Sequence, residues 1–403
     1  MPRVVLMRLG RQTRQNRGDA LDHPESRLSS PLSQANESTV HHWISEPQDL
    51  ATRLSRWTDV EVLALDTEFI RERTWWPQLA LVQMVVPGQD VLLVDPTVPG
   101  ISSVLRPLLD NRDVIKLMHS ASEDVQALQR GCGAVPAPLF DTQIAAALCG
   151  LGAGLGYQKL VETQLGIALP KSETRSDWLR RPLSDSQLAY AADDVLHLHA
   201  LHALLRDRLR DLGREQWLAE DCARLVASSG NETPERYPHL ALRGAQYLDA
   251  EAQARLCRLL RWRELQARAT DRPKGWILDN ELSVTLARKP PEDARSLYDF
   301  LDTQPKAPRK LRTELYNALA APLTAEERDV PLLQTPNSAQ KKLLRTLQDT
   351  VAAEAGKLGL SDGILASRRT LEALLDGNGW PTALEGWRRP ILEPALLPLL
   401  AAH

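Results

Sequence analysis

The pattern of apolar and polar positions predicts a strand-rich first part. Short apolar runs separated by turns such as Pro87-Gly88 are typical of strands joined in antiparallel hairpins. These runs lie at 62–65, 79–86 and 91–94, and they are followed by a helix at 101–110, a strand at 114–118 and a helix from 122. Hairpin-linked strands followed by alternating strands and helices predict a mixed sheet flanked by helices.

The remainder of the chain has a helical pattern. Asn231, Pro234 and Pro238 mark a linker between the two parts. Beyond it, 259–291 holds a long helix, a turn and a second helix, and 343–375 repeats this plan. We expect each of the three parts to bury a core of its own. Residues 1–38 have no sustained period and are expected to be a disordered tail or an over-extended start.

Acidic residues follow the first apolar strand. Val62 to Leu65 are apolar, and Asp66 and Glu68 then alternate onto one face of the strand. Two neighbouring carboxylates at the end of a buried strand repel each other and lose solvation. A hard divalent cation is the natural partner of such a pair.

Two later segments add further acids. The helical pattern from Ser184 to Leu212 places Tyr190 and Asp194 one turn apart on one face. In the segment 116–128, Ser120 or Ser122 can cap a helix whose first turn carries Asp124. For Asp124 an interaction with the helix macrodipole alone is a strong alternative.

Aromatic and basic residues follow the acidic strand. They are Phe69, Arg71, Arg73, Trp75 and Trp76, and they are expected to form a stacking and phosphate-guiding surface for terminal nucleotides. Core packing is an equally good account of the tryptophans. Gln83 can support the metal carboxylates or be an ordinary polar strand residue, and His119 is expected to be a core histidine or one that supports the site from outside.

Composition limits the possible classes of protein. The 403 residues carry a net charge of −3, which argues against a nonspecific polyanion binder. Residues 241–320 nevertheless hold 15 Lys and Arg against 11 Asp and Glu, an excess that fits either a nucleic-acid footprint or a solvated helix surface. The four cysteines have no paired spacing, so disulfides and zinc are unsupported. No segment reaches the length of a membrane span, and we expect a cytoplasmic monomer.

Long stretches of the sequence carry a family resemblance. The stretches are DTEFIRERTWWPQLALVQ (66–83), HSASED (119–124), FDTQIAAAL (140–148) and KSETRSDWLRRPLSDSQLAYAADDV (171–195). In this order they resemble the three motifs of the DEDD exonuclease superfamily, in its tyrosine-containing branch. Over roughly residues 39–401 the chain resembles the bacterial ribonuclease D family more closely. Trp75 and Trp76 stand where many relatives carry tyrosines.

The resemblance implies a ribonuclease H-like mixed-sheet exonuclease domain at 39–230. Two all-α domains of the helicase-and-RNase-D C-terminal type (HRDC) would follow at 240–322 and 330–403, the second being the weaker match. It implies two divalent metal ions, Mg²⁺ with Mn²⁺ as a substitute. The implied metal ligands are Asp66, Glu68, Asp124 and Asp194, with Tyr190 orienting the attacking water.

The implied activity is 3′–5′ exoribonucleolytic release of 5′-mononucleotides from structured RNA such as tRNA precursors. A DNA exonuclease is a second possibility, because relatives with this catalytic domain act on DNA. A noncatalytic nucleic-acid-binding adaptor is a third, and the intact acidic set argues against it.

Overall fold

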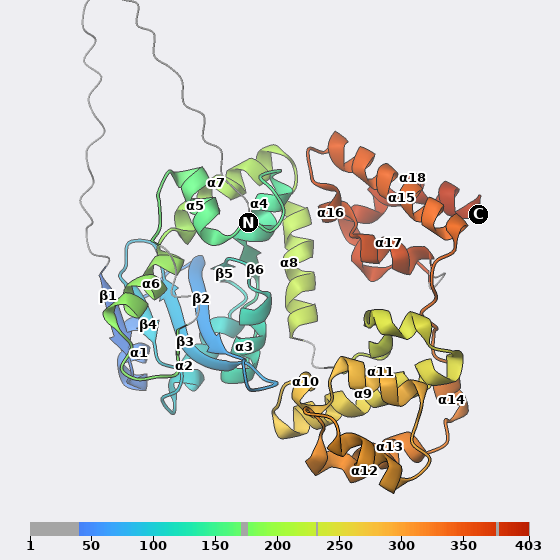
Figure 1. Ribbon diagram of the computed structural model, residues 1–403. Helices are drawn as coiled ribbons and strands as arrows, with labels where there is room; N and C mark the ends of the chain where they lie inside the picture. The colour runs from blue at the N-terminus through green and yellow to red at the C-terminus, as the bar shows by residue number, and fades with distance from the viewer. Residues whose placement is uncertain (1–39, 171–175, 231–232, 376–378, 403) are drawn as a thin grey trace, which may run out of the picture. The chain divides into compact units, whose positions relative to one another are not determined.

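The computed structural model describes residues 40–170, 176–230, 233–375 and 379–402 (Figure 1). The expected tail at 1–38 lies outside these residues. So do the KSETR stretch at 171–175 and Asn231 of the predicted linker.

A six-stranded mixed sheet lies at the centre of the first part, which we call the sheet region (residues 40–230). The strand order is β1-β4-β3-β2-β5-β6. Strands β2, β3 and β4 are antiparallel neighbours, whereas the pairs β1–β4, β2–β5 and β5–β6 are parallel. The strands are β1 (His41–Ile44), β2 (Val62–Ile70), β3 (Gln78–Val85), β4 (Val91–Val94), β5 (Ile115–Met118) and β6 (Leu139–Asp141). The predicted mixed sheet with hairpin-linked strands is confirmed.

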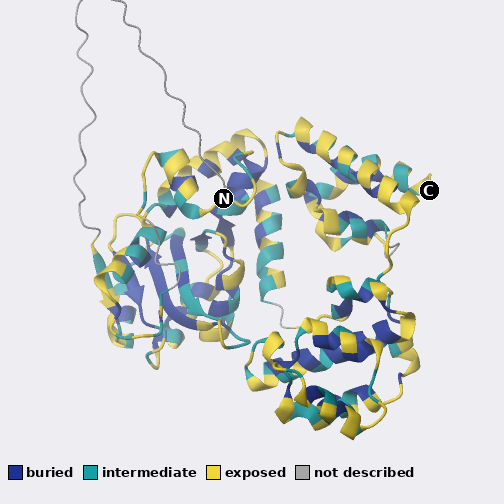
Figure 2. Ribbon diagram, viewed as in Figure 1, coloured by how far each residue is buried: buried dark blue, intermediate teal, exposed yellow. Residues whose placement is uncertain are grey.

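Helices cover the sheet of this region. They are α1 (Pro47–Leu54), α2 (Ile101–Asp110), α3 (Ser122–Cys132), α4 (Thr142–Leu148), α5 (Tyr157–Leu165), α6 (Asp185–Leu196), α7 (Leu198–Asp211) and α8 (Glu215–Ser229). Helix α3 contacts β2 and β3, α6 contacts β2, β3 and β4, and α7 contacts β5. Figure 2 shows the strands as largely buried, because apolar residues fill β3 and β4 on both faces.

The helical pattern predicted over 184–212 is confirmed, but it forms two helices, because α6 and α7 are separated at His197. The Tyr157 hydroxyl donates to the Asp193 carbonyl at 3.0 Å and accepts from the His197 backbone N–H at 3.3 Å. These two backbone groups would bond each other in a continuous α-helix. A side chain inserted into the hydrogen-bond ladder therefore marks the break.

A first helical region (residues 238–328) has a core of its own. Its elements are η1 (Pro238–Ala241), η2 (Arg243–Tyr247), α9 (Ala250–Thr270), α10 (Lys274–Ile277), α11 (Asn280–Arg288), α12 (Ala294–Asp302), η3 (Arg309–Leu311), α13 (Arg312–Ala320) and α14 (Ala325–Arg328). Asp249, Asp279 and Asp293 cap α9, α11 and α12 by accepting from backbone N–H groups. Buried residues of α9, α11, α12 and α13 form one apolar cluster.

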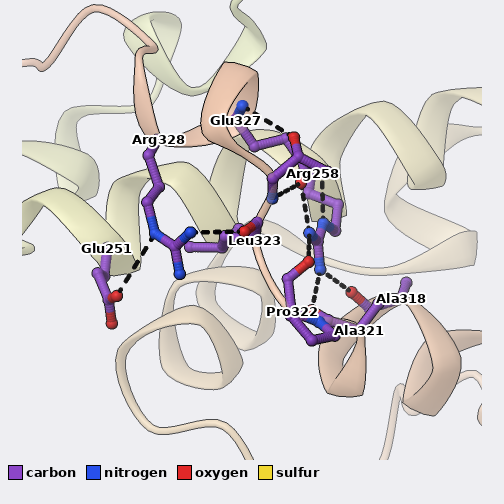
Figure 3. A network of polar contacts seen from close by, with 9 residues as sticks. Glu251, Arg258, Ala318, Ala321, Pro322, Leu323, Glu327 and Arg328 are labelled. Carbon is purple, nitrogen blue, oxygen red and sulfur yellow. Dashed lines mark hydrogen bonds and ion pairs between the residues drawn. The ribbon is translucent and has the colours of Figure 1, made fainter.

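Polar contacts join α9 to the end of this region (Figure 3). The Arg258 guanidinium donates to Glu327 at 2.6 Å and to the carbonyls of Ala318, Ala321 and Pro322. Arg258 lowers the pKa of Glu327 to about 2. One arginine thus ties the long helix to both α13 and α14.

A second helical region (residues 338–401) shares a core with the sheet region. Its elements are α15 (Ser338–Lys357), α16 (Asp362–Leu365), α17 (Arg368–Leu375), η4 (Thr382–Leu384), η5 (Gly386–Arg388) and α18 (Arg389–Ala401). Its buried side chains belong to the same apolar cluster as those of the sheet. The expectation that each part buries a core of its own is therefore wrong for this region.

Helix α8 carries the contact that joins the two. Trp217 of α8 stacks on Trp387 with ring centroids 4.2 Å apart and planes 5° apart. Arg388 forms a bidentate ion pair with Asp221 of α8, and both side chains are about 90% buried. This contact is invisible to sequence periodicity, because it depends on which surface α8 presents. In the described part of the chain, no helix has both the length and the apolar character needed to cross a membrane.

Candidate active site

Asp66 and Glu68 lie in the last half of β2, a central strand. Pairing with β3 on one side and β5 on the other buries Leu63, Ala64 and Leu65 completely. The ladder to β5 ends at Ala64, so the acidic half of β2 is paired on the β3 side only. An irregularity in the β2–β3 register follows Glu68. Both carboxylates are consequently held by the strand backbone, in the part of β2 that has no β5 neighbour.

Asp124 comes from the first turn of α3 and is 8% exposed. The Thr67 hydroxyl donates to Asp124 Oδ1 at 2.5 Å, which links α3 to the acidic strand. The expected serine cap is wrong, because Ala121 occupies the N-cap position and no side chain caps the helix. The Asp141 carboxylate instead accepts from the N–H groups of Ser120 and Ala121 and also caps α4. Ser120 has a φ of 59°, so Asp141 fixes a turn that periodicity could not predict.

Tyr190 and Asp194 face the acids from α6. A capping box between Ser184 and Gln187 starts this helix. The Tyr190 hydroxyl lies close enough to the Asp194 carboxylate, one turn later, to lower the pKa of that carboxyl. Its ring lies beside the buried Trp178, with the centroids 6.0 Å apart.

Burial and neighbouring negative charges raise the pKa values of all four carboxylates. The pKa of Asp66 is raised well above its usual value, first by burial and then by the charges of Asp124, Asp194 and Glu68. Burial, with Asp194 and Asp124, raises the pKa of Glu68 to about 8. Burial raises the pKa of Asp194 to about 7 and that of Asp124 to about 6, although hydrogen bonds from Tyr190 and Thr67 oppose the two shifts. The structure therefore brings acids from three separate segments within mutual electrostatic range.

Such a cluster suits a hard cation. Carboxylate oxygens are the preferred protein ligands of Mg²⁺, and a bound cation would relieve the repulsion that raises these pKa values. Among the described residues, no three His, Cys, Asp or Glu side chains are already arranged to hold a metal ion. The chemistry of the donor groups fits a divalent ion.

The tryptophan pair contacts the first helical region. The backbone N–H groups of Trp75 and Trp76 both donate to Asp271 Oδ1 at 3.0 Å. Arg268 and Lys274 lie over the Trp75 ring, with the Arg268 guanidinium carbon and the Lys274 ammonium 5.2 and 4.7 Å from its centroid. Arg130 lies 3.9 Å over Trp76. Cations already occupy positions over both indole rings, so the pair joins the sheet region to α9 and α10.

The other expected substrate-binding residues, Arg71, Arg73 and Phe69, lie in three different environments. Arg71 donates to the Trp75 carbonyl and to Gln126 at 3.0 Å each, and Arg73 is exposed. Phe69 packs against the core of the sheet region. Arg71 and the tryptophans line a cavity of about 370 Å³ together with Glu264, Arg268 and Lys274.

Sequence reasoning missed three residues that shape the site. Thr67 lies between the two paired acids and binds Asp124, and its place inside the acidic motif is a signal that could have drawn attention to it. Tyr157 opens the helix directly after Asp194, and Asp271 holds the tryptophan loop. No local pattern identifies either of these. His119 is packed with Tyr157 and bonds the Thr142 hydroxyl at 2.8 Å through Nδ1.

The fold and this cluster define a class of enzyme. A mixed sheet whose central strand carries two acids, with further acids from two flanking helices and a tyrosine one turn before the last, is the framework of a 3′–5′ exonuclease. A family model for 3′–5′ exonucleases matches residues 41–210.

Comparison with known proteins narrows the class to a family. The chain is 54% identical to ribonuclease D of Xanthomonas oryzae pv. oryzae over 361 residues, which cover 90% of this chain and 99% of that protein. It is 37% identical to ribonuclease D of Pseudomonas paraeruginosa over 369 residues, covering 88% and 96%. The crystal structure of Escherichia coli RNase D, an exoribonuclease involved in structured RNA processing, superposes with a TM-score of 0.78 at 28% identity, covering 90% of this chain and 99% of that one.

The chain belongs to the ribonuclease D family. It is a hydrolytic 3′–5′ exoribonuclease, and membership of the family implies divalent metal cofactors.

Proposed function

We propose that this chain trims the unpaired 3′ ends of structured RNA such as tRNA precursors, releasing 5′-mononucleotides with the help of two Mg²⁺ ions. The observation that carries the proposal is the set of four buried carboxylates, all with raised pKa values, with Tyr190 beside Asp194. Mn²⁺ substitutes for Mg²⁺, since both accept carboxylate and water oxygens.

The metal ligands in this proposal are Asp66, Glu68, Asp124 and Asp194. When bound, two divalent ions supply positive charge both to the attacking water and to the leaving oxygen. The chain itself contributes the rigid strand that fixes Asp66 and Glu68 and the Thr67 hydroxyl that orients Asp124. Separate segments supply the ligands, so the correct fold is a condition of metal binding.

Tyr190 orients the attacking water. Burial and the charges of Asp194 and Glu68 raise the pKa of its hydroxyl, so it stays protonated at neutral pH. A phenol in this state serves as a hydrogen-bonding group and is a poor general base. The influence of Tyr190 on the pKa of Asp194 supports a position of the hydroxyl beside the acid cluster.

The RNA reaches the acids along basic surface. Phe69, Arg71, Arg73, Trp75 and Trp76 form the substrate-binding segment in this proposal, and the cavity beside it brings Arg71, Arg268 and Lys274 near one another. Because cations lie over the indole rings, phosphates of the RNA backbone are the groups best matched to this cavity. The segment therefore guides the strand mainly through its backbone, without regard to base sequence.

The remaining parts of the proposal concern organisation. The exonuclease domain spans 39–230, and the helical regions correspond to HRDC domains at 240–322 and 330–403 that grip the folded portion of the RNA. The excess of basic residues in 241–320 supports this role. The enzyme acts as a monomer in the cytoplasm.

The test is digestion of a 5′-labelled RNA hairpin with an unpaired 3′ tail, and of its DNA counterpart, in Mg²⁺, Mn²⁺ or EDTA. We expect stepwise shortening of the RNA that stops a few nucleotides from the stem, because opening each pair costs about 1.4 kcal/mol and must be driven by binding alone. The Asp66→Asn variant should bind the RNA and leave it intact.

Three outcomes would contradict the proposal. Internal fragments, or rapid digestion through a long stem, would exclude a trimming exonuclease. Faster digestion of the DNA hairpin would favour the DNA exonuclease. Binding without release of nucleotides in either metal would favour the noncatalytic adaptor.

A further inference from the structure

Gln83 is a buried amide with no hydrogen-bond partner. Its side chain is 0% exposed, and neither its Oε1 nor its Nε2 atom has a partner. Exchanging the two atoms leaves both unpaired, so the choice of amide orientation does not affect the result. An unpaired amide in an apolar interior is unfavourable, and such a group in a native fold calls for a ligand or a partner that arrives later.

The strand register places Gln83 beside a proposed metal ligand. Gln83 of β3 lies directly opposite Asp66 of β2 in the antiparallel ladder. Residues directly opposite each other point to the same face of a sheet, with Cβ atoms roughly 4.5–5.5 Å apart. The two side chains therefore share one face and lie within reach of each other.

The residues beside Gln83 on β3 and opposite it on β4 are apolar. Leu93 lies opposite it on β4, and Leu81 and Val85 flank it along β3. On β2, Asp66 lies directly opposite Gln83 and Glu68 lies diagonally, so Asp66 is the nearer acceptor for the amide. The position of the unpaired group points to the acid cluster.

We propose that Gln83 is a positioning residue of the metal site, whose amide N–H holds the Asp66 carboxylate in the orientation that accepts a divalent ion. The inference rests on the proposed role of Asp66 as a metal ligand. An ionised Asp66 carboxylate is a strong hydrogen-bond acceptor, and a bound cation favours the ionised form. Gln83 gains its partner in that state, so the bond favours the metal-bound form over the metal-free form.

The test compares Gln83→Met with wild type in three measurements: Mn²⁺ affinity by calorimetry, urea unfolding in EDTA, and turnover at saturating metal. Methionine keeps the length of the side chain and removes both polar atoms. Loss of a hydrogen bond that orients a metal ligand weakens metal binding by roughly 10–100-fold, and we expect a loss in that range. Because Gln83 has no partner without metal, the unfolding midpoint in EDTA should stay the same or rise.

Gln253→Met is the matched control. Gln253 is a buried glutamine of α9 whose amide bonds the Leu248 and Leu333 carbonyls and the Leu333 N–H. Its replacement should lower the midpoint in EDTA and leave Mn²⁺ affinity unchanged. Opposite responses of the two glutamines would separate metal-site positioning from ordinary core support.

A second measurement covers the case in which Gln83→Met does not fold. Gln83 and Gln253 are the glutamines with buried side chains in the described part of the chain, so their side-chain amide protons should exchange slowly. In Gln253→Met the protected glutamine amide signal that remains belongs to Gln83. Its NMR shift should move as Mg²⁺ is added, and a signal that does not move would overturn the inference.

The outcomes distinguish this inference from the proposed function. If Asp66→Asn binds Mn²⁺ as tightly as wild type, the proposed metal site itself is wrong. If Asp66→Asn loses Mn²⁺ while Gln83→Met binds it as tightly as wild type, the site stands and the role of Gln83 is refuted.

Discussion

Replacing Glu68 with Gln should stabilise the metal-free protein by an amount that grows with pH. Burial and the nearby Asp194 and Asp124 raise the pKa of Glu68 from 4.5 to about 8. A folded-state pKa above the unfolded value means that proton binding stabilises the fold fully below pH 4.5 and that this stabilisation is lost as pH rises through 8. Glutamine mimics the protonated acid at every pH, so the variant escapes that loss.

The size of the effect follows from proton linkage. Between pH 6.5 and pH 8, a group with folded and unfolded pKa values of about 8 and 4.5 loses about 1.6 kcal/mol of folding free energy. The difference in unfolding free energy between Glu68→Gln and wild type should therefore rise by about 1.6 kcal/mol over this range. Groups that Glu68 does not influence contribute equally in both proteins and cancel in the difference. Asp66, whose pKa the charge of Glu68 raises, does not cancel, so the figure gives the order of magnitude of the difference.

The assay is urea unfolding in EDTA at pH 6.5, 7.2 and 8.0, with equal m values as the condition for comparison. Glu123→Gln serves as a control, because Glu123 adjoins Asp124 in the sequence but its side chain is 65% exposed. That control should change far less with pH than Glu68→Gln, because Glu123 is the smallest of the causes of the raised pKa of Asp124. Adding Mg²⁺ at pH 8 should stabilise wild type more than Glu68→Gln, because the variant lacks one of the proposed ligands. A constant difference between Glu68→Gln and wild type across the pH range would refute the argument that the folded protein holds the Glu68 carboxyl in a buried acid cluster.

Three further predictions follow from the structure. Tyr190→Phe should reduce turnover by roughly 10²–10⁴-fold in single-turnover assays while RNA binding persists, and an unchanged rate would assign the tyrosine to packing alone. Arg388→Ala should lower the unfolding free energy, measured by urea titration, by about 3 kcal/mol. This is the low end of the range for breaking a buried ion pair, because Arg224 still pairs with Asp221 at 3.1 Å. A loss below about 1 kcal/mol would show that the pair does not stabilise the junction. A chain ending at residue 236 should expose the α8 surface around Trp217. We therefore expect it to bind an apolar dye and to self-associate in size-exclusion chromatography. A monomer that binds no dye would show that the shared core is dispensable.

The function of the chain depends on a few local patterns and several distant contacts. The contact of Asp271 with the tryptophan loop connects residues 196 positions apart in the sequence, and it joins the helical part to the segment that follows the acidic strand. The similarity to ribonuclease D proteins extends over both parts, because the relatives align over about nine-tenths of the chain. The exonuclease domain and the helical regions therefore belong to one shared architecture.

The sequence by itself determined the features that repeat locally. The apolar run at 62–65 predicted a buried strand, alternation placed Asp66 and Glu68 on one of its faces, and helical spacing predicted the Tyr190–Asp194 pair. The helical pattern that begins at Ser184 starts at the residue that caps α6. Each of these depends on neighbours within about four positions, which is the range over which periodicity carries information.

Tertiary structure alone decided what depends on distant partners. Tyr157 breaks the helix after Asp194 from 40 positions away, and Asp141 shapes the turn before Asp124 from about 20 positions away. The stack of Trp217 on Trp387 merges the second helical region with the core of the sheet. The pKa values of the four acids likewise follow from burial and mutual charge, which exist only once three separate segments meet in the fold.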